Sequence, residues 1–370
     1  AWPDPDLRLT HSWQAPLDVF LHSRVWLSFH MTLDWEDAIP VYRWLSPLAG
    51  ALYLAVALAL SRQSGLAAPW LTYGLLASLG VIQLFFGYVE NYSFAAAGVL
   101  AYLWLGLSSL YGTRPIWIAS AVLALTIATH PSTAVLAPSL CFLAWATARR
   151  GQPRNKFLFV LVFQVGLPML VVLLLTIALM EAGGHGIQTL LTSDRPGGSD
   201  ARWFVPLWDV STRWERYTMF SWEHVRDFLN EQILVAPVVL PSLVLMGSFW
   251  VLGACGRVLG LDRLAPILFD VTYPMSQRYP ASRSIGLFCL FTSALYFLFI
   301  WTWNPDYGGQ RDWDLFGLAT IPATLLLVYI LPRMLANRHY VRMGALPLLL
   351  VQALHTSAWI YQNTLPWEWP

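Results

Sequence analysis

Long apolar runs separated by short polar connections dominate the amino-acid sequence. Many of these runs approach the roughly 20 residues that a helix needs to cross a bilayer. The pattern predicts ten spans, at residues 44–61, 66–86, 93–111, 115–129, 131–148, 157–181, 232–254, 285–303, 314–332 and 343–360. We therefore expect an all-α fold, a polytopic transmembrane helical bundle. The fourth and fifth spans meet at His130-Pro131, where proline suits the first turn of the second helix.

Composition supports this class. Apolar residues make up 57% of the 370 residues and charged residues only 12%, about half of the roughly 25% that is usual in soluble domains. A net charge of +1 leaves no dense basic face for nucleic acid. The three cysteines lie in or beside apolar runs without metal-ligand spacing, so they predict neither a disulfide framework nor a zinc site.

The basic residues of the connections predict an orientation. When the connections are assigned alternately to two sides, thirteen of the 22 lysines and arginines fall on one side, with only Asp262 and Asp270 as acidic residues. We expect this side to face the cytoplasm. The outward side then holds residues 1–43, the loop 87–92, the turn at His130, the loops 182–231 and 304–313, and the C-terminus. An outward N-terminus requires an upstream signal or span; if it is a span, that span would be the eleventh.

Two domains follow from this topology: an outer-face segment, residues 1–43, with a juxtamembrane helix, and a transmembrane domain, residues 44–370. The outer loop 182–231 within the second domain is rich in tryptophan. Tryptophan favours the headgroup zone of a membrane. The loop is either an interfacial belt or a lid over a lipid-linked or sugar substrate.

The unusual polar residues gather at the outward ends of the spans. Ionisable side chains at membrane depth are costly and usually face protein or water, so we expect these residues to converge on one cavity. They are Asp4, Asp6, Asp18, His22, Glu90, Asn91 and His130, together with Asp306, Arg311, Asp312 and Asp314 of the stretch N-P-D-Y-G-G-Q-R-D-W-D.

Several of these residues also have a structural interpretation. Asp312 and Asp314 precede an apolar helix, where aspartate caps free N–H groups and complements the helix dipole. Arg311 either pairs with one of them or binds substrate. His130 is favoured as a hydrogen-bonded turn residue. The many outward carboxylates are compatible with binding of a divalent cation, although no ligand spacing identifies a metal site.

One part of the chain resembles a known family. Residues 12–22 read S-W-Q-A-P-L-D-V-F-L-H, and residues 38–52 read A-I-P-V-Y-R-W-L-S-P-L-A-G-A-L. This resembles the first outer loop and the following span of the GT-C superfamily of polytopic glycosyltransferases, of the protein mannosyltransferase and aminoarabinose transferase types. There a P-P-L-like motif precedes a juxtamembrane helix, and an arginine opens a span. Ala15-Pro16-Leu17 stands at the first motif and Tyr42-Arg43 at the start of the second.

The resemblance implies a polyprenyl-phosphate sugar donor at the outer leaflet of a bacterial inner membrane and an acceptor that enters from outside. An outward carboxylate would act as general base on the acceptor hydroxyl; the candidates are Asp4, Asp6, Asp18 and Glu90. The planar fork of arginine suits the departing phosphate, and Arg311 is the candidate. In the family the catalytic aspartate follows the first span, well before the P-P-L motif. If its equivalent precedes Ala1, the residues here form a supporting shell.

Three functions are therefore considered. The leading hypothesis is a membrane glycosyltransferase, with membrane lipid and a lipid-linked sugar donor as partners. The second is a non-catalytic, GT-C-like subunit of a larger membrane complex, which the departure at Gln14-Ala15 supports. The third is a lipid or solute transporter. It is disfavoured because no span carries a charge near its middle and no repeat of discontinuous helices is evident.

Overall fold

The computed structural model describes residues 12–63, 65–149, 156–192, 203–212, 215–258, 282–305, 312–334 and 338–365. Within these ranges the regular elements are helices, which confirms the all-α prediction there. In chain order they are α2 (Pro16–Leu33), α3 (Ile39–Ser61), α4 (Pro69–Ala77), η1 (Gly80–Phe85), α5 (Ser93–Tyr111), α6 (Ile116–Thr129), η2 (Pro131–Leu136), α7 (Ala137–Ala148), α8 (Lys156–Phe159), η3 (Val160–Gly166), α9 (Leu167–Ala182), α10 (Ile187–Thr192), α11 (Trp222–Val235), α12 (Val239–Val258), α14 (Ser282–Thr302), α15 (Trp313–Phe316), η5 (Gly317–Ala319), α16 (Thr320–Met334) and α17 (Arg338–Thr364).

Seven helical segments of the described chain are long and apolar enough to cross a membrane. They are Ile39–Ser61, Ser93–Tyr111, Pro131–Ala148, Phe157–Ala182, Arg283–Thr302, Trp313–Arg333 and Met343–Thr364. An eighth is added if the bent pair formed by α11 and the first part of α12 counts as one span. These segments are those of an integral membrane protein of the helical type.

The expected number of ten spans is not reproduced, for reasons that are local. The predicted span 66–86 divides into α4 and the 3₁₀ helix η1, with a break at Ser78-Leu79. The predicted span 232–254 is interrupted after α11, because Pro237 lacks an N–H group and disfavours the helical conformation of Ala236. The chain bends there by 113°. Helix α6 has 14 residues and is short for a span.

The break between α4 and η1 exposes backbone carbonyl groups that need donors in a membrane. Helix α17 supplies them from the far end of the chain. Gln352 donates from Nε2 to the carbonyl oxygen of Ser78 at 3.2 Å, and Thr356 donates from Oγ1 to the same oxygen at 2.6 Å. The carbonyl group of Ser78 therefore has hydrogen-bond donors although the helix is interrupted there.

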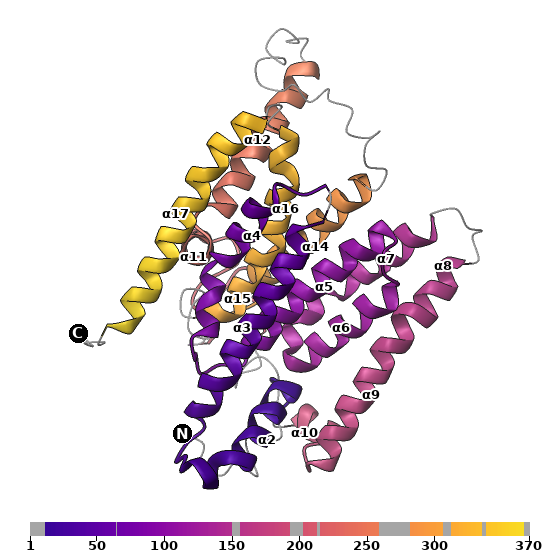
Figure 1. Ribbon diagram of the computed structural model, residues 1–370, viewed down its shortest axis with the longest axis vertical. Coiled ribbons are helices and arrows are strands. Elements are labelled where there is room, and N and C mark those ends of the chain that lie inside the picture. The colour runs from indigo at the N-terminus through magenta and orange to yellow at the C-terminus, as the bar shows by residue number, and fades with distance from the viewer. Residues whose placement is uncertain are drawn as a thin grey trace.

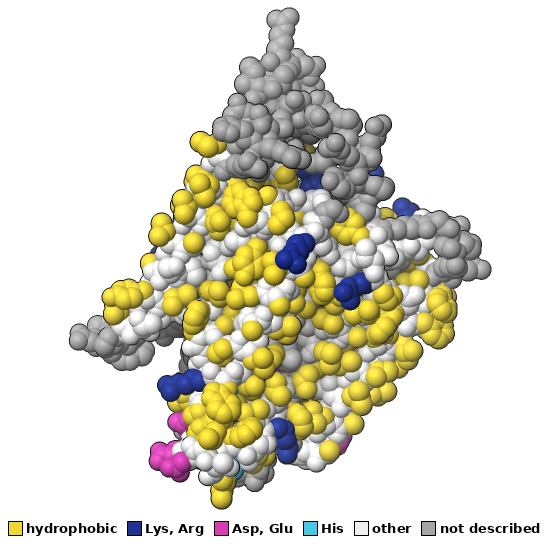
Figure 2. Space-filling view, viewed as in Figure 1, with side chains coloured by type: hydrophobic (Ala, Val, Ile, Leu, Met, Phe, Trp, Pro, Cys, Tyr) yellow, Lys and Arg dark blue, Asp and Glu magenta, His cyan; other side chains and the backbone are white. Residues whose placement is uncertain are grey.

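The bundle is elongated, with α2 and α10 at one end of its long axis and α12 reaching toward the other (Figure 1). Helices α5 and α16 lie inside, whereas α9 and α17 follow opposite flanks and expose most of their apolar side chains. The end that contains α2 is called the α2 end below. Figure 2 shows hydrophobic flanks and acidic side chains gathered at the α2 end of this face.

Helix α2 is the predicted juxtamembrane helix, and it begins at Pro16, where the missing N–H group costs no intrahelical bond. It packs on the start of α3 through a small separate core that includes Val19, Trp26, Val41 and Tyr42. This packing fixes the polar face of α2 against the bundle.

Candidate functional site

Asp18 and His22 form the first part of the site, one turn apart on α2. Both are buried, with exposed fractions of 1% and 3%. Nδ1 of His22 lies 2.8 Å from the backbone oxygen of Asp18 and 3.1 Å from its Oδ2. Apart from this contact, the described residues give neither carboxylate oxygen of Asp18 a hydrogen-bond partner. The His22 ring stacks on Tyr42 with 4.2 Å between centroids. This ring contact joins α2 to α3 beside the pair formed by Asp18 and His22.

The loop 86–92, between η1 and α5, brings Tyr88, Glu90 and Asn91 to the same end. Gly87 has a φ of 83°, which favours glycine. A Cβ atom there would lie 3.1 Å from Cγ of Arg43. The loop therefore crosses directly over the arginine that opens α3. Tyr42 donates to Oδ1 of Asn91 at 3.1 Å, which connects the loop to the Asp18 and His22 contact.

Asp312 and Asp314 enter from the start of α15. Asp312 occupies the N-cap position but makes no capping hydrogen bond with its side chain. Asp314 is buried; it accepts from the backbone N–H of Leu315 at 2.9 Å and from the Tyr88 hydroxyl at 3.3 Å. The structure therefore shows no side-chain cap at Asp312, and Asp314 lies inside the first turn of α15, where its carboxylate also contacts the loop 86–92.

Asp18, Glu90, Asp312 and Asp314 are called the acidic cluster. Glu90 lies at its rim with an exposed side chain, but the protein atoms around its carboxylate still remove part of its hydration. This desolvation raises the pKa of Glu90, the backbone N–H of Asn91 opposes the rise, and the charges of Asp312 and Asp18 add to it. Desolvation also raises the pKa of Tyr88, with further contributions from Asp314 and Glu90. Three separate segments thus act on one another electrostatically.

His130 does not belong to the acidic cluster. Its Nδ1 is 2.7 Å from the Ser132 hydroxyl, and its ring packs on Tyr92 at 4.5 Å. Burial lowers the pKa of His130 from 6.5 to about 4. The structure gives it the contacts of a turn residue that joins α6 to η2.

Four candidates from the sequence lie outside the described residues: Asp4, Asp6, Asp306 and Arg311. Of the other candidates, the structure brings Asp18, His22, Glu90, Asn91, Asp312 and Asp314 to one end. Within the described ranges, no group of three or more histidine, cysteine, aspartate or glutamate residues is arranged to hold a metal ion.

Sequence reasoning missed a second polar group, which lies around α11. Residues 222–231 were assigned to the outer loop, but they form a helix whose N-cap is Ser221. Tyr217 donates to Oδ2 of Asp227 at 2.8 Å. The His224 ring lies between Tyr217, on which it stacks, and the tilted ring of Trp301, with centroids 4.8 and 4.3 Å away. The spacing of His224, Phe228, Glu231 and Val235 is that of one helix face, and this pattern could have revealed the helix.

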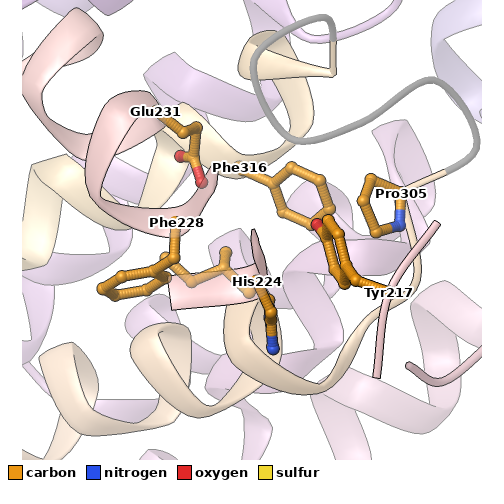
Figure 3. Close-up of a pocket in the computed structure, with 7 residues that line it drawn as sticks. Tyr217, His224, Phe228, Glu231, Pro305 and Phe316 are labelled. Atoms are coloured by element: carbon orange, nitrogen blue, oxygen red, sulfur yellow. The ribbon is translucent and has the colours of Figure 1, made fainter. Parts of the chain in front are cut away.

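A small cavity lies on this face of α11. Tyr217, His224, Phe228, Glu231, Ile300, Pro305 and Phe316 line it, and its volume is about 10 Å³, which is close to the room that one water molecule needs. Figure 3 shows its lining side chains converging from α11, from the segment before it and from the ends of two neighbouring elements. Asp312 interacts electrostatically with both Glu90 and Glu231, so the cavity and the acidic cluster are neighbours.

The tryptophan-rich loop is attached to the end of α14 beside this cavity. Val205 donates its N–H to the carbonyl oxygen of Thr302, and Asn304 donates to that of Trp203, both at 2.9 Å. Trp208 and Trp222 are exposed. The loop therefore combines a backbone anchor near the site with exposed aromatic rings of the kind that favour the headgroup zone.

Comparison of the chain with protein-family models, with curated proteins and with solved structures finds no match.

Proposed function

We propose that this protein is a membrane glycosyltransferase that moves a sugar from a polyprenyl-phosphate donor to an acceptor at the α2 end, which faces outward from a bacterial inner membrane. The observation that carries the proposal is the acidic cluster: Asp18 of α2 and Asp312 and Asp314 at the start of α15 lie close enough to Glu90 of the loop 86–92 to act on it through their charges. The resemblance of residues 12–52 to the GT-C superfamily supports the same reaction.

Glu90 is the proposed general base among the described residues. Its carboxylate is accessible at the rim, and its pKa is raised, which makes it a better proton acceptor near neutral pH. The acceptor hydroxyl gives its proton to Glu90 while its oxygen forms a bond to the anomeric carbon. The bond from that carbon to the phosphate oxygen breaks, and its electron pair stays on the polyprenyl phosphate. Asp18 is sealed by its neighbours, so it acts on Glu90 through its charge.

Arg43 is the proposed contact for the phosphate. It is exposed in the first turn of α3, and within the described chain it has no ion-pair partner. Trp44, Leu48 and Leu52 continue from it along the exposed face of α3. A lipid phosphate on Arg43 would thus leave its hydrocarbon chain beside an apolar helix face, and the guanidinium would balance the charge that develops on the leaving phosphate.

The test is transfer of sugar from polyprenyl-phosphate sugars by the purified protein. Glu90→Gln is expected to lower kcat by about 10²- to 10⁴-fold, the usual contribution of a general base. Glu36→Gln changes an exposed carboxylate at the same end and serves as the matched control. Equal rates for the two variants would remove Glu90 from the mechanism. No transfer with any donor, together with firmly copurifying proteins, would favour the non-catalytic subunit instead.

A second candidate function, transport, is supported by one observation that the sequence did not reveal. The chain contains two discontinuous segments, α4 with η1 and α11 with α12, and such breaks are used by transporters to bind substrates. Uptake of labelled sugar or lipid into proteoliposomes without chemical transfer would favour this candidate.

A further inference from the structure

Helix α11 turns polar residues toward the interior of the protein. His224, Glu231, Gln232 and Val235 are buried, with Glu231 only 2% exposed, whereas Trp222 on the other face is exposed. An amphipathic helix normally buries its apolar face. The inward face of α11 therefore combines core packing by Val235 with three buried polar side chains that packing does not require.

The Glu231 carboxylate is incompletely paired. Its Oε1 accepts a hydrogen bond from Nε2 of Gln232 at 2.7 Å. The described residues provide no hydrogen-bond partner for Oε2 and no cation for the group. The charged neighbours that act on it, Asp227 and Asp312, are also acidic. A buried carboxylate in these surroundings destabilises a fold, so its presence points to a ligand.

The cavity beside Glu231 limits what that ligand can be. In Figure 3 the carboxylate points from α11 into the space beside the rings of Phe316 and Tyr217. A volume of about 10 Å³ admits one oxygen-sized group and excludes a whole sugar ring. The free carboxylate oxygen accepts a hydrogen bond, and the aromatic and proline walls suit C–H groups. A single hydroxyl group on an apolar carbon frame fits both conditions.

We propose that this cavity is a subsite for one hydroxyl group of the transferred sugar, with Glu231 accepting its hydrogen bond. The inference rests on the proposed function, because the acidic cluster next to it is taken as the place of transfer. Asp312 is near both places, since its charge acts on both Glu90 and Glu231. A sugar that reaches from the base to the cavity would be oriented by this hydroxyl.

The experiment measures binding without turnover. Trp301 packs on His224, which lines the cavity, so tryptophan fluorescence of the purified protein can be titrated with methyl glycosides of several configurations and with their monodeoxy analogues. At least one glycoside is expected to bind saturably, and removal of one particular hydroxyl should weaken binding at least tenfold. Glu231→Gln should weaken it about tenfold, because the amide replaces one carboxyl oxygen with a nitrogen and the bound hydroxyl group loses a hydrogen bond.

Glu223→Gln is the control, because Glu223 lies on the same helix with an exposed side chain; its binding should equal that of the wild type. Glu231→Gln should also melt at the same or a higher temperature, since it removes a buried carboxyl group that has acidic neighbours. Should that variant fail to fold, Glu231→Asp keeps the charge but withdraws it from the cavity, and the same loss of affinity is expected.

The possible results separate the two proposals. Sugar binding that depends on Glu231, without any transfer, would support a site for a sugar hydroxyl group at Glu231 but overturn the transferase, and with it the assignment of that site to a transferred sugar. Transfer that continues while Glu231→Gln binds the glycoside like the wild type would support the transferase and overturn the subsite. Absence of saturable binding for every glycoside would also overturn the subsite, as would a lowered melting temperature with unchanged affinity.

Discussion

His355 of α17 holds the end of α11 in place: its Nε2 lies 2.9 Å from the backbone carbonyl oxygen of Leu234. A carbonyl oxygen only accepts, so Nε2 carries the proton and donates. This bond satisfies a carbonyl near the bend between α11 and α12, as Gln352 and Thr356 do for the break after α4. One polar stripe on α17 therefore supports two interruptions of the bundle.

The first prediction concerns this stripe. His355→Leu should lower the free energy of unfolding by about 1–3 kcal/mol, because the Leu234 carbonyl loses its donor in a region without water. Thermal denaturation in detergent measures the effect. Ser357→Ala changes an exposed residue of the same helix and should leave the melting temperature unchanged. Equal melting temperatures for both variants would contradict the stabilising role of the hydrogen bond from His355 to Leu234.

The second prediction concerns the close approach of η1 to α11. A Cβ atom on Gly80 would lie 2.9 Å from both Cα and the carbonyl oxygen of Val235 and 2.5 Å from the ring of Trp359. Gly80→Ala should therefore destabilise the protein by about 1–3 kcal/mol through overpacking. Gly247→Ala meets nothing within 4 Å in α12 and should be neutral or slightly stabilising. A neutral Gly80→Ala would show that the two segments are less closely packed.

The third prediction concerns pH. Burial lowers the pKa of His130 from 6.5 to about 4, so the folded state holds it neutral while the unfolded chain protonates it. Its contribution to stability is present above pH 6.5 and is lost as the pH falls toward 4, at up to about 1.4 kcal/mol per pH unit. Comparison of unfolding between pH 7 and pH 4 for the wild type and His130→Asn measures this. Parallel pH profiles would exclude the effect.

The fourth prediction concerns the phosphate contact. Arg43→Gln should weaken binding of a polyprenyl phosphate about tenfold or more, because a charge-assisted hydrogen bond to phosphate is lost. Arg43→Lys should retain only part of the wild-type affinity for the polyprenyl phosphate, since lysine lacks the planar guanidinium group. Arg24→Gln is the control: Arg24 is exposed on α2, over the ring of Phe20. If phosphatidylglycerol competes as well as the polyprenyl phosphate, Arg43 is a general headgroup contact.

The helical membrane class follows from the amino-acid sequence alone, because apolar runs such as 93–111 and 131–148 have the length and hydropathy of membrane-spanning helices. The sequence also determined where one helix begins, since proline at 131 fits a first turn whatever surrounds it. The alternation of spans brought Asp18, Glu90 and Asp314 to one end before any contact was known. Local patterns of this kind need no information about distant residues.

Only the tertiary structure decided the interruptions and the second part of the site. The break at Ser78 is stable because Gln352 and Thr356, far along the chain, supply its donors. Glu231 is a buried carboxyl group only because α11 folds against the end of α14 and the start of α15, whereas the sequence pattern assigned it to the outer loop 182–231. Hydropathy reports what each residue prefers on average, whereas these positions are set by which distant side chains satisfy a backbone group or surround a charge.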